Sequence, residues 1–146
     1  MRRLLTYWFP PIIWAAVILS ASTDAFSASN TGGWLERITA WLGYPLAPST
    51  HDLVNHVIRK IAHVTEYGIF SALSFRALRG ERTRWTLRWA IGAVVLAAFV
   101  ASIDEFHQTF VPSRTGTWHD VVLDTAGATF MQIIIRAAQV LFFRRS

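Results

Sequence analysis

Three polar segments of the chain gather ionisable side chains between apolar stretches. The segment HDLVNHVIRKIAHVTEYG covers 51–68, SIDEFHQTFVPSR covers 102–114, and SRTGTWHDVVLDTAG covers 113–127. Carboxylates, imidazoles and cationic side chains that meet in one place can transfer protons and hold an anionic ligand. An ionisable residue within an apolar stretch is costly to place near lipid, so it points first to a functional site.

In the first segment, Lys60, His63 and Tyr67 follow helical spacing, and Glu66 lies one turn from His63. Residues three and four apart share one face of a helix. From Lys60 to Glu66 a helix rises roughly 9 Å, so this stripe extends below the surface. The spacing predicts one polar face that reaches into the interior.

In the second segment, Asp104 and Gln108 recur on one helical face, with Glu105 adjacent. These acids fall at the C-terminal end of a predicted helix, where the helix dipole disfavours carboxylates. We expect something to offset that cost. The candidates are Lys60, Arg114, a bound cation or a change of protonation.

In the third segment, Asp120, Asp124 and Gly127 are spaced as one helical face, and Arg114 precedes them. Asp120 fits the acid of a capping box that starts at Thr117. Asp124 has no such local reason, and an acid deep in a spanning helix costs about 2.5 to 3.5 kcal/mol. Gly127 would let another helix approach closely.

The elements that must position these residues are apolar helices. Hydrophobic residues make up 53% of the 146-residue chain, charged residues 16%, and the mean hydropathy is +0.34. A spanning helix needs roughly 17 to 25 apolar residues. We therefore predict a single all-α domain over 1–146, a membrane bundle of four transmembrane helices. Their apolar blocks are Leu4 to Ser20, Val57 to Leu78, Trp85 to Ile103 and Val121 to Phe143.

A short interfacial helix is predicted between the first two spans. The segment TGGWLERITAWLG, 31–43, places Trp34, Ile38 and Trp41 on one face. Tryptophans on such a face are typical of the headgroup region of a membrane. The pair Ser49 and Asp52 reads as a second capping box, which predicts a helix start there.

The first apolar block has an alternative interpretation as a secretory signal. Met1-Arg2-Arg3 precedes it, and Ala25-Phe26-Ser27 resembles a cleavage site. Pro10 and Pro11 and the length of the run favour a retained span instead.

Arginines predict the orientation, because cytoplasmic ends and short loops collect basic residues. With four spans, the loop RGERTRWTLRW, 79–89, lies on the same side as both basic termini. We therefore expect cytoplasmic termini and an extracytoplasmic polar face. This rule explains the loop better than nucleic-acid binding does, and no nucleic-acid partner is expected. The residues on which the orientation rests are Arg2, Arg3, Arg76, Arg79, Arg82, Arg84, Arg88, Arg144 and Arg145.

The order of the motifs resembles the VanZ-like family of small polytopic bacterial membrane proteins. The strings are K-x-x-H-x-x-E-Y, then D-E-x-x-Q with V-P-x-R, then D-x-x-x-D-x-x-G, within about 55–128. Ser113 stands where glycine is common in the family, and Asp124 where asparagine is common. The resemblance implies a role at the cell envelope in the bacterial inner membrane. It supplies no reaction, and the teicoplanin tolerance for which the family is named is not inferred for this chain.

Two functions for one polar pocket follow from these residues. The first is an enzyme that acts on a lipid-linked or anionic envelope substrate at the outer leaflet, and the second is a non-catalytic binder of a lipid headgroup or glycopeptide. The catalytic candidates are His63, Glu66, Asp104 and Glu105, with His63 or Glu105 as general base and Asp104 or Glu66 orienting it. The substrate-binding candidates are Lys60, Tyr67, Gln108, Arg114, Asp120 and Asp124.

Other interpretations stay open or are disfavoured. The polar residues can instead form a structural network that fixes helix register. A divalent cation, Mg²⁺, Mn²⁺ or Zn²⁺, suits the acids and imidazoles, but no diagnostic ligand spacing is present. Proton-coupled transport is disfavoured, because the cytoplasmic halves of the predicted spans carry little besides Arg136. The expected partners are membrane lipids and a lipid-linked envelope precursor.

Overall fold

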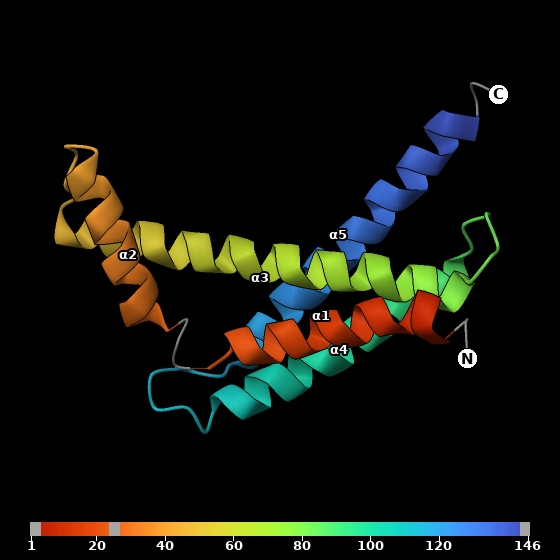
Figure 1. The fold of residues 1–146 in the computed structure, drawn as a ribbon, viewed down its shortest axis with the longest axis horizontal. Helices are drawn as coiled ribbons and strands as arrows, with labels where there is room; N and C mark the ends of the chain where they lie inside the picture. Colours follow the sequence, from red (N-terminus) through yellow and green to blue (C-terminus); the bar gives the residue numbers. More distant parts are fainter. Residues whose placement is uncertain (1–3, 24–26, 144–146) are drawn as a thin grey trace.

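The computed structural model describes residues 4–23 and 27–143, and within them it contains helices and no strand (Figure 1). This confirms the all-α prediction. A π-helical segment, η1 (Leu4–Trp8), leads into five α-helices. These are α1 (Phe9–Ala21), α2 (Ala28–Trp41), α3 (Pro48–Arg79), α4 (Leu87–Gln108) and α5 (Trp118–Phe143).

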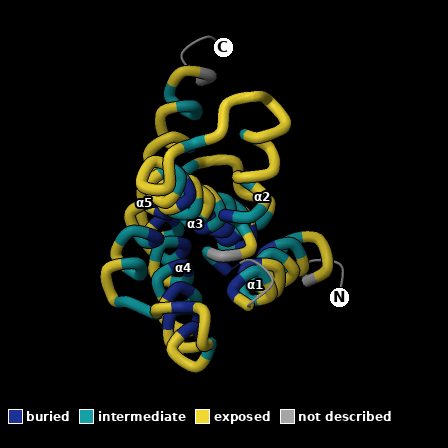
Figure 2. Tube along the Cα trace, turned by 90° about the vertical axis from the view of Figure 1, so that its left-hand side faces the viewer, coloured by how far each residue is buried: buried dark blue, intermediate teal, exposed yellow. Residues whose placement is uncertain are grey.

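The central element is α3, which runs across the molecule and packs against the other four α-helices (Figure 1). Helices α1 and α4 lie along one side of α3, while α5 crosses it obliquely. Viewed from the end, buried positions gather where α1, α3 and α4 face one another, and α2 is largely exposed (Figure 2). The core therefore lies along the face of α3 that carries the predicted polar stripe.

Small residues let the helices approach closely. Ala93, Ala97 and Ala101 form a fully buried stripe on α4. Ala97 and Ala101 pack in a cluster with Tyr67 and Phe70 of α3, and Ala93 packs in a second cluster with Phe75. Small side chains at regular helical spacing are typical of tightly packed helix pairs in membranes. The same face of α4 continues past Ala101 into the polar residues at its C-terminal end, which turns those residues inward.

The close helix approach predicted at Gly127 is confirmed. A Cβ atom there would lie 2.6 Å from the Val64 carbonyl oxygen and 3.0 Å from its Cα. Only glycine permits α5 to pass the α3 backbone at this distance. The crossing brings the polar faces of the two helices together.

Within residues 4–23 and 27–143, two helices are long and apolar enough to cross a membrane, α4 over Leu87–Gln108 and α5 over Trp118–Leu141. The four-span prediction is therefore not confirmed, because only α4 and α5 of the described helices have the length and composition of a span. The apolar helix Leu5–Ala21 is shorter. Helix α3 is long, but Arg59, Lys60 and Glu66 lower its hydropathy.

The prolines of the first apolar block lie where η1 passes into α1. Pro10 and Pro11 are in the first turn of α1, and Trp8 before this turn is already helical. Membrane helices tolerate such prolines where neighbouring groups satisfy the freed backbone. Ile18 of the same helix is 1% exposed and belongs to the core. Residues 25 and 26 of the alternative cleavage site fall outside the described residues.

The predicted interfacial segment is helical as α2. Trp34 and Trp41 on this helix are 66% and 85% exposed, so its apolar face is open. The prediction of a capping box at Ser49 and Asp52 is wrong. Helix α3 begins at Pro48 after Ala47, with no side-chain capping hydrogen bond, because proline sets the first helical residue by itself.

The connections lie at opposite ends of the bundle. The connection 80–86 lies toward the end where η1 begins, and the connection 109–117 lies at the other end (Figure 1). Gln139 ties α5 to the first connection, since its amide donates to Thr83 O and its oxygen accepts from Trp85 N. Arg82 and Arg88 lie over the Trp89 ring at this end. The predicted cytoplasmic residues Arg2, Arg3, Arg144 and Arg145 fall outside the described residues.

Candidate functional site

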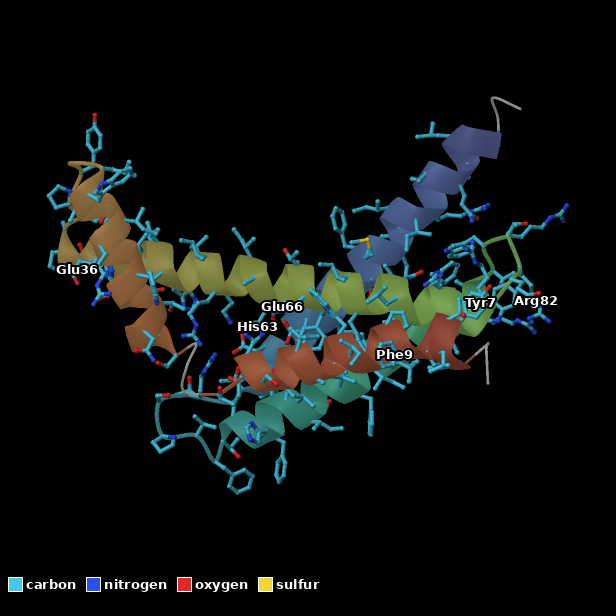
Figure 3. The ribbon with its side chains drawn as sticks, viewed as in Figure 1. Tyr7, Phe9, Glu36, His63, Glu66 and Arg82 are labelled. Atoms are coloured by element: carbon cyan, nitrogen blue, oxygen red, sulfur yellow. The ribbon has the colours of Figure 1, made fainter. Side chains whose placement is uncertain are left out.

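The polar stripes of α3, α4 and α5 meet at the end of the bundle that holds the connection 109–117. Asp104 of α4 and Asp124 of α5 are fully buried there, and Gln108 is 3% exposed. His63 and Glu66 lie on α3 in the same region, far from Tyr7 and Arg82 at the other end (Figure 3). The three segments therefore contribute to one cluster, together with α1, which sequence reasoning did not include.

Glu105 holds the connection 109–117 against the end of α4. Its Oε2 accepts a hydrogen bond from the Thr117 backbone N–H at 2.8 Å. Gln108 Nε2 donates to Asp104 Oδ2 at 3.1 Å and lies 3.4 Å from Glu105 Oε1. A Cβ atom at Gly116 would collide with the Glu105 carbonyl oxygen, so the chain folds back closely here. Backbone and amide donors thus stabilise carboxylates that the helix dipole disfavours.

The start of α5 confirms half of the predicted capping box. The Asp120 backbone N–H lies 3.3 Å from Thr117 Oγ1, and the Thr117 hydroxyl donates to Asp120 Oδ2 at 3.0 Å. In a full capping box the acid would accept from the Thr117 N–H. Here Glu105 accepts the hydrogen bond from the Thr117 N–H instead, and Asp120 forms an ion pair with Lys60. Lys60 therefore pairs with the acid of α5 and not with an acid of α4.

His63 faces a carboxylate that the sequence interpretation had assigned to ligand binding. Its Nδ1 lies 3.5 Å from Asp124 Oδ2, whereas Asp104 or Glu66 had been expected to orient the ring. The Tyr67 and His63 rings are stacked with 6.4 Å between their centroids. His63, Glu105 and Asp124 each offer a ligand atom, and these atoms lie within 4.8 Å of one another. These three residues come from α3, α4 and α5.

Helix α1 also borders the site and contacts Arg114 and Glu66. Arg114 Nη2 donates to Ala21 O at 2.8 Å and to Thr23 O at 3.2 Å. Trp14 Nε1 donates to the Glu66 carbonyl at 2.9 Å. Carbonyls at the end of a helix attract cations, which explains how an arginine sits there while 8% exposed. A terminal carbonyl has no signature in side-chain spacing, so this contact was not predictable from the motifs.

Two adjoining cavities open on the cluster. The smaller, of about 100 Å³, is polar and is lined by His56, Arg59, Lys60, His63, Glu105, Gln108, Thr115 and Asp120. The larger, of about 310 Å³, is mostly apolar and is lined by Val17, Ala21, Ser22, Thr31, Ile58, Arg59, Ala62, His63, Glu66 and Arg114. Arg59 and His63 line both. Sequence reasoning missed Arg59, which falls between the motif positions, and did not include His56 among the candidate site residues.

The comparison with family models shows which family the chain belongs to. The VanZ/LLP1 family model matches residues 7–142. The chain belongs to this family. The match extends well beyond the motif-bearing part at about 55–128 and includes α1, whose end contacts Arg114. No curated protein and no solved structure matches the chain. Together with the apolar helices α4 and α5, membership of the VanZ family indicates a membrane protein.

Proposed function

We propose that this VanZ family protein binds an anionic amphiphile of the bacterial envelope, with the headgroup in the polar cavity and the apolar chain in the larger one. The observation that carries the proposal is the shared wall of Arg59 and His63 between a polar and an apolar cavity. An amphiphile needs both environments side by side. A membrane lipid or a lipid-linked envelope precursor has this chemistry.

The cations of the polar cavity favour an acidic headgroup. Arg59 and Lys60 line it from α3, together with His56. Arginine binds phosphate or carboxylate with two parallel hydrogen bonds, and lysine adds a point charge. Arg114 lines the apolar cavity and adds a further cation there. The buried residues of the same cluster are Tyr67, Gln108, Asp104 and Asp124.

The proposal includes a four-span arrangement in the inner membrane, with α1 and α3 crossing beside α4 and α5. In this arrangement both termini are cytoplasmic and the site faces the extracytoplasmic side. The arginines of the connection 80–86 at the opposite end support this orientation. Helix α3 is tolerated as a span because its polar stripe turns toward α4 and α5.

A reaction on the bound amphiphile is the second candidate function. It is favoured by His63, which lies against the buried Asp124 carboxylate. A carboxylate beside an imidazole orients the ring for proton transfer. In this version His63 or Glu105 acts as general base, while Glu66 and Asp104 shape the electrostatics around it.

The proposal is tested with the purified chain in detergent and a polyprenyl phosphate as the probe. Native mass spectrometry should show retention of this lipid in preference to zwitterionic phosphatidylcholine. Arg59→Gln should reduce retention at least tenfold, about 1.4 kcal/mol, since it removes a charge-assisted contact. Arg82→Gln is the matched control, because it removes the same charge at the other end of the bundle. Equal retention by wild type and Arg59→Gln would exclude the proposed site.

A further inference from the structure

We infer that His63, Glu105 and Asp124 form a binding site for a divalent transition-metal ion, with Zn²⁺ as the reference ion. The three side chains come from α3, α4 and α5, and their ligand atoms lie within 4.8 Å of one another. Ligand atoms that share an ion at about 2.1 Å lie within roughly 4 Å of each other. Small side-chain rotations are therefore enough to close the set on one ion.

The strongest indication of a ligand is Asp124 itself. The residue is fully buried, and neither carboxylate oxygen receives a hydrogen bond from the described residues. The His63 Nδ1 atom is 3.5 Å away, beyond the range of a good N–H···O bond. A buried carboxylate without donors is costly unless a cation offsets its charge. Asp124 points into the cluster, where an ion would supply that charge.

The side chains around the cluster add negative charge to it. Asp104 is fully buried beside it and accepts from the neutral amide of Gln108. Lys60 is engaged by Asp120, outside the three-residue set. A divalent ion at His63, Glu105 and Asp124 would balance the excess of buried carboxylates. It would also explain why acids are tolerated at the C-terminal end of α4.

The ligand set indicates which ions fit. One imidazole nitrogen and two carboxylates suit Zn²⁺ and Mn²⁺ better than Mg²⁺, which prefers oxygen ligands and retains its waters. Three protein ligands leave a coordination position open, as in catalytic zinc sites. His63 and Glu105 also line the polar cavity, so that position faces the space assigned to the headgroup.

The surroundings hold one ligand in place before an ion arrives. Glu105 Oε2 accepts from the Thr117 N–H at 2.8 Å, and Oε1 lies 3.4 Å from Gln108 Nε2. Contacts of this kind around a ligand tune metal affinity. The inference deepens the proposed function, because a metal ion beside the polar cavity would bind the phosphate oxygen of an anionic amphiphile. The metal site itself requires no amphiphile.

The test is a Zn²⁺ titration of the full chain, purified in detergent without a histidine tag and freed of metal by a chelator. Calorimetry should show one saturable site. Asp124→Asn and Glu105→Gln should each weaken Zn²⁺ binding by about 10- to 100-fold or more. The controls are His119→Ala and Glu36→Gln, which change an exposed histidine and an exposed acid outside the cluster and should leave affinity unchanged.

Co²⁺ provides a measurement on the unaltered chain, so the test does not depend on the folding of any variant. Co²⁺ should bind with a visible absorption spectrum and be displaced by Zn²⁺. Absence of saturable binding to wild type overturns the inference, as does unchanged affinity in both Asp124→Asn and Glu105→Gln. If polyprenyl phosphate is retained while Zn²⁺ is not bound, the metal site is wrong and the amphiphile pocket stands. If Zn²⁺ is bound while polyprenyl phosphate is not retained, the metal site stands and the proposed amphiphile pocket is wrong.

Discussion

Lys60 of α3 and Asp120 of α5 form an ion pair between residues that lie sixty positions apart in the chain. Their side chains are 37% and 22% exposed, so the pair lies at the mouth of the site and not in its buried part. Asp120 also accepts from the Thr117 hydroxyl that caps α5. The pair therefore links the start of one helix to the polar face of another, beside the polar cavity.

Replacing Lys60 by glutamine should affect ligand binding more than stability. A partly exposed ion pair contributes about 0 to 1 kcal/mol, so the thermal unfolding temperature should change little. Retention of polyprenyl phosphate should fall, because a cation is lost from the cavity wall. Thermal unfolding and native mass spectrometry on the same preparation check both parts. A large loss of stability with normal retention would assign Lys60 a structural role.

Gly127→Ala should destabilise the contact between α3 and α5. The added methyl group would lie 2.6 Å from Val64 O, and backbone atoms cannot move aside as a flexible side chain can. Overpacking of this kind costs about 1 to 3 kcal/mol. Gly33→Ala in α2 is the matched control, since no atom lies within 4 Å of a Cβ there. Denaturant unfolding of both variants in detergent tests the difference, and equal stabilities would contradict the close helix crossing.

Much of the fold was readable from apolar blocks and helical spacing. The stripe Lys60, His63 and Tyr67 on α3 depends only on local periodicity, and its members line the polar cavity or are buried. The buried alanines of α4 were not singled out from the sequence. The helix start at Thr117 was predictable because its cap is local. The start at Pro48 was misread, since a proline overrides the Ser49 pattern.

The pairings within the site were not readable from the sequence. Spacing predicted that Lys60, Glu105, Asp120 and Asp124 would meet, but it could not say that Lys60 selects Asp120 or that His63 faces Asp124. Such choices depend on helix rotation and on the depth at which α5 crosses α3. The contact of Arg114 with carbonyls of α1 was missed for the same reason. Long-range partners leave no periodic signal along the chain.

Glu105 should show a graded response to substitution. Its Oε2 accepts from the Thr117 N–H, and glutamine retains an acceptor for that bond while alanine does not. Loss of one partner of a buried hydrogen bond costs about 1 to 3 kcal/mol. Hydrogen exchange at the Thr117 amide should therefore be slowest in wild type, faster in Glu105→Gln and fastest in Glu105→Ala. Identical exchange in all three would show that Glu105 does not hold the connection 109–117.

Glu105→Gln also separates the two candidate functions. If the metal-free protein acts on the bound amphiphile with Glu105 as general base, the variant should retain the lipid and lose the reaction, since Glu105 then holds no ion. The measurement is lipid retention by native mass spectrometry, paired with chromatography of the lipid products after incubation. Full turnover by the variant would exclude Glu105 as the base. Loss of retention would show instead that the carboxylate shapes the pocket itself.

The packing of α2 on α3 should depend on pH through His51, which lies outside the proposed spanning part of α3. The Gly32 carbonyl accepts a hydrogen bond from His51 Nε2 at 2.9 Å, and this contact, with the neighbouring Asp52, raises the pKa of His51 above its ordinary value of 6.5. A raised folded-state pKa means that the protonated ring stabilises the contact. That stabilisation is complete below pH 6.5 and is lost as the pH rises through the folded-state pKa. Hydrogen exchange in α2, corrected for intrinsic rates, should show protection that is constant below pH 6.5 and falls as the pH rises above it. His51→Gln is the matched control, because its amide can donate to the same carbonyl but does not titrate. An equal loss of protection in His51→Gln would assign the pH response to another group.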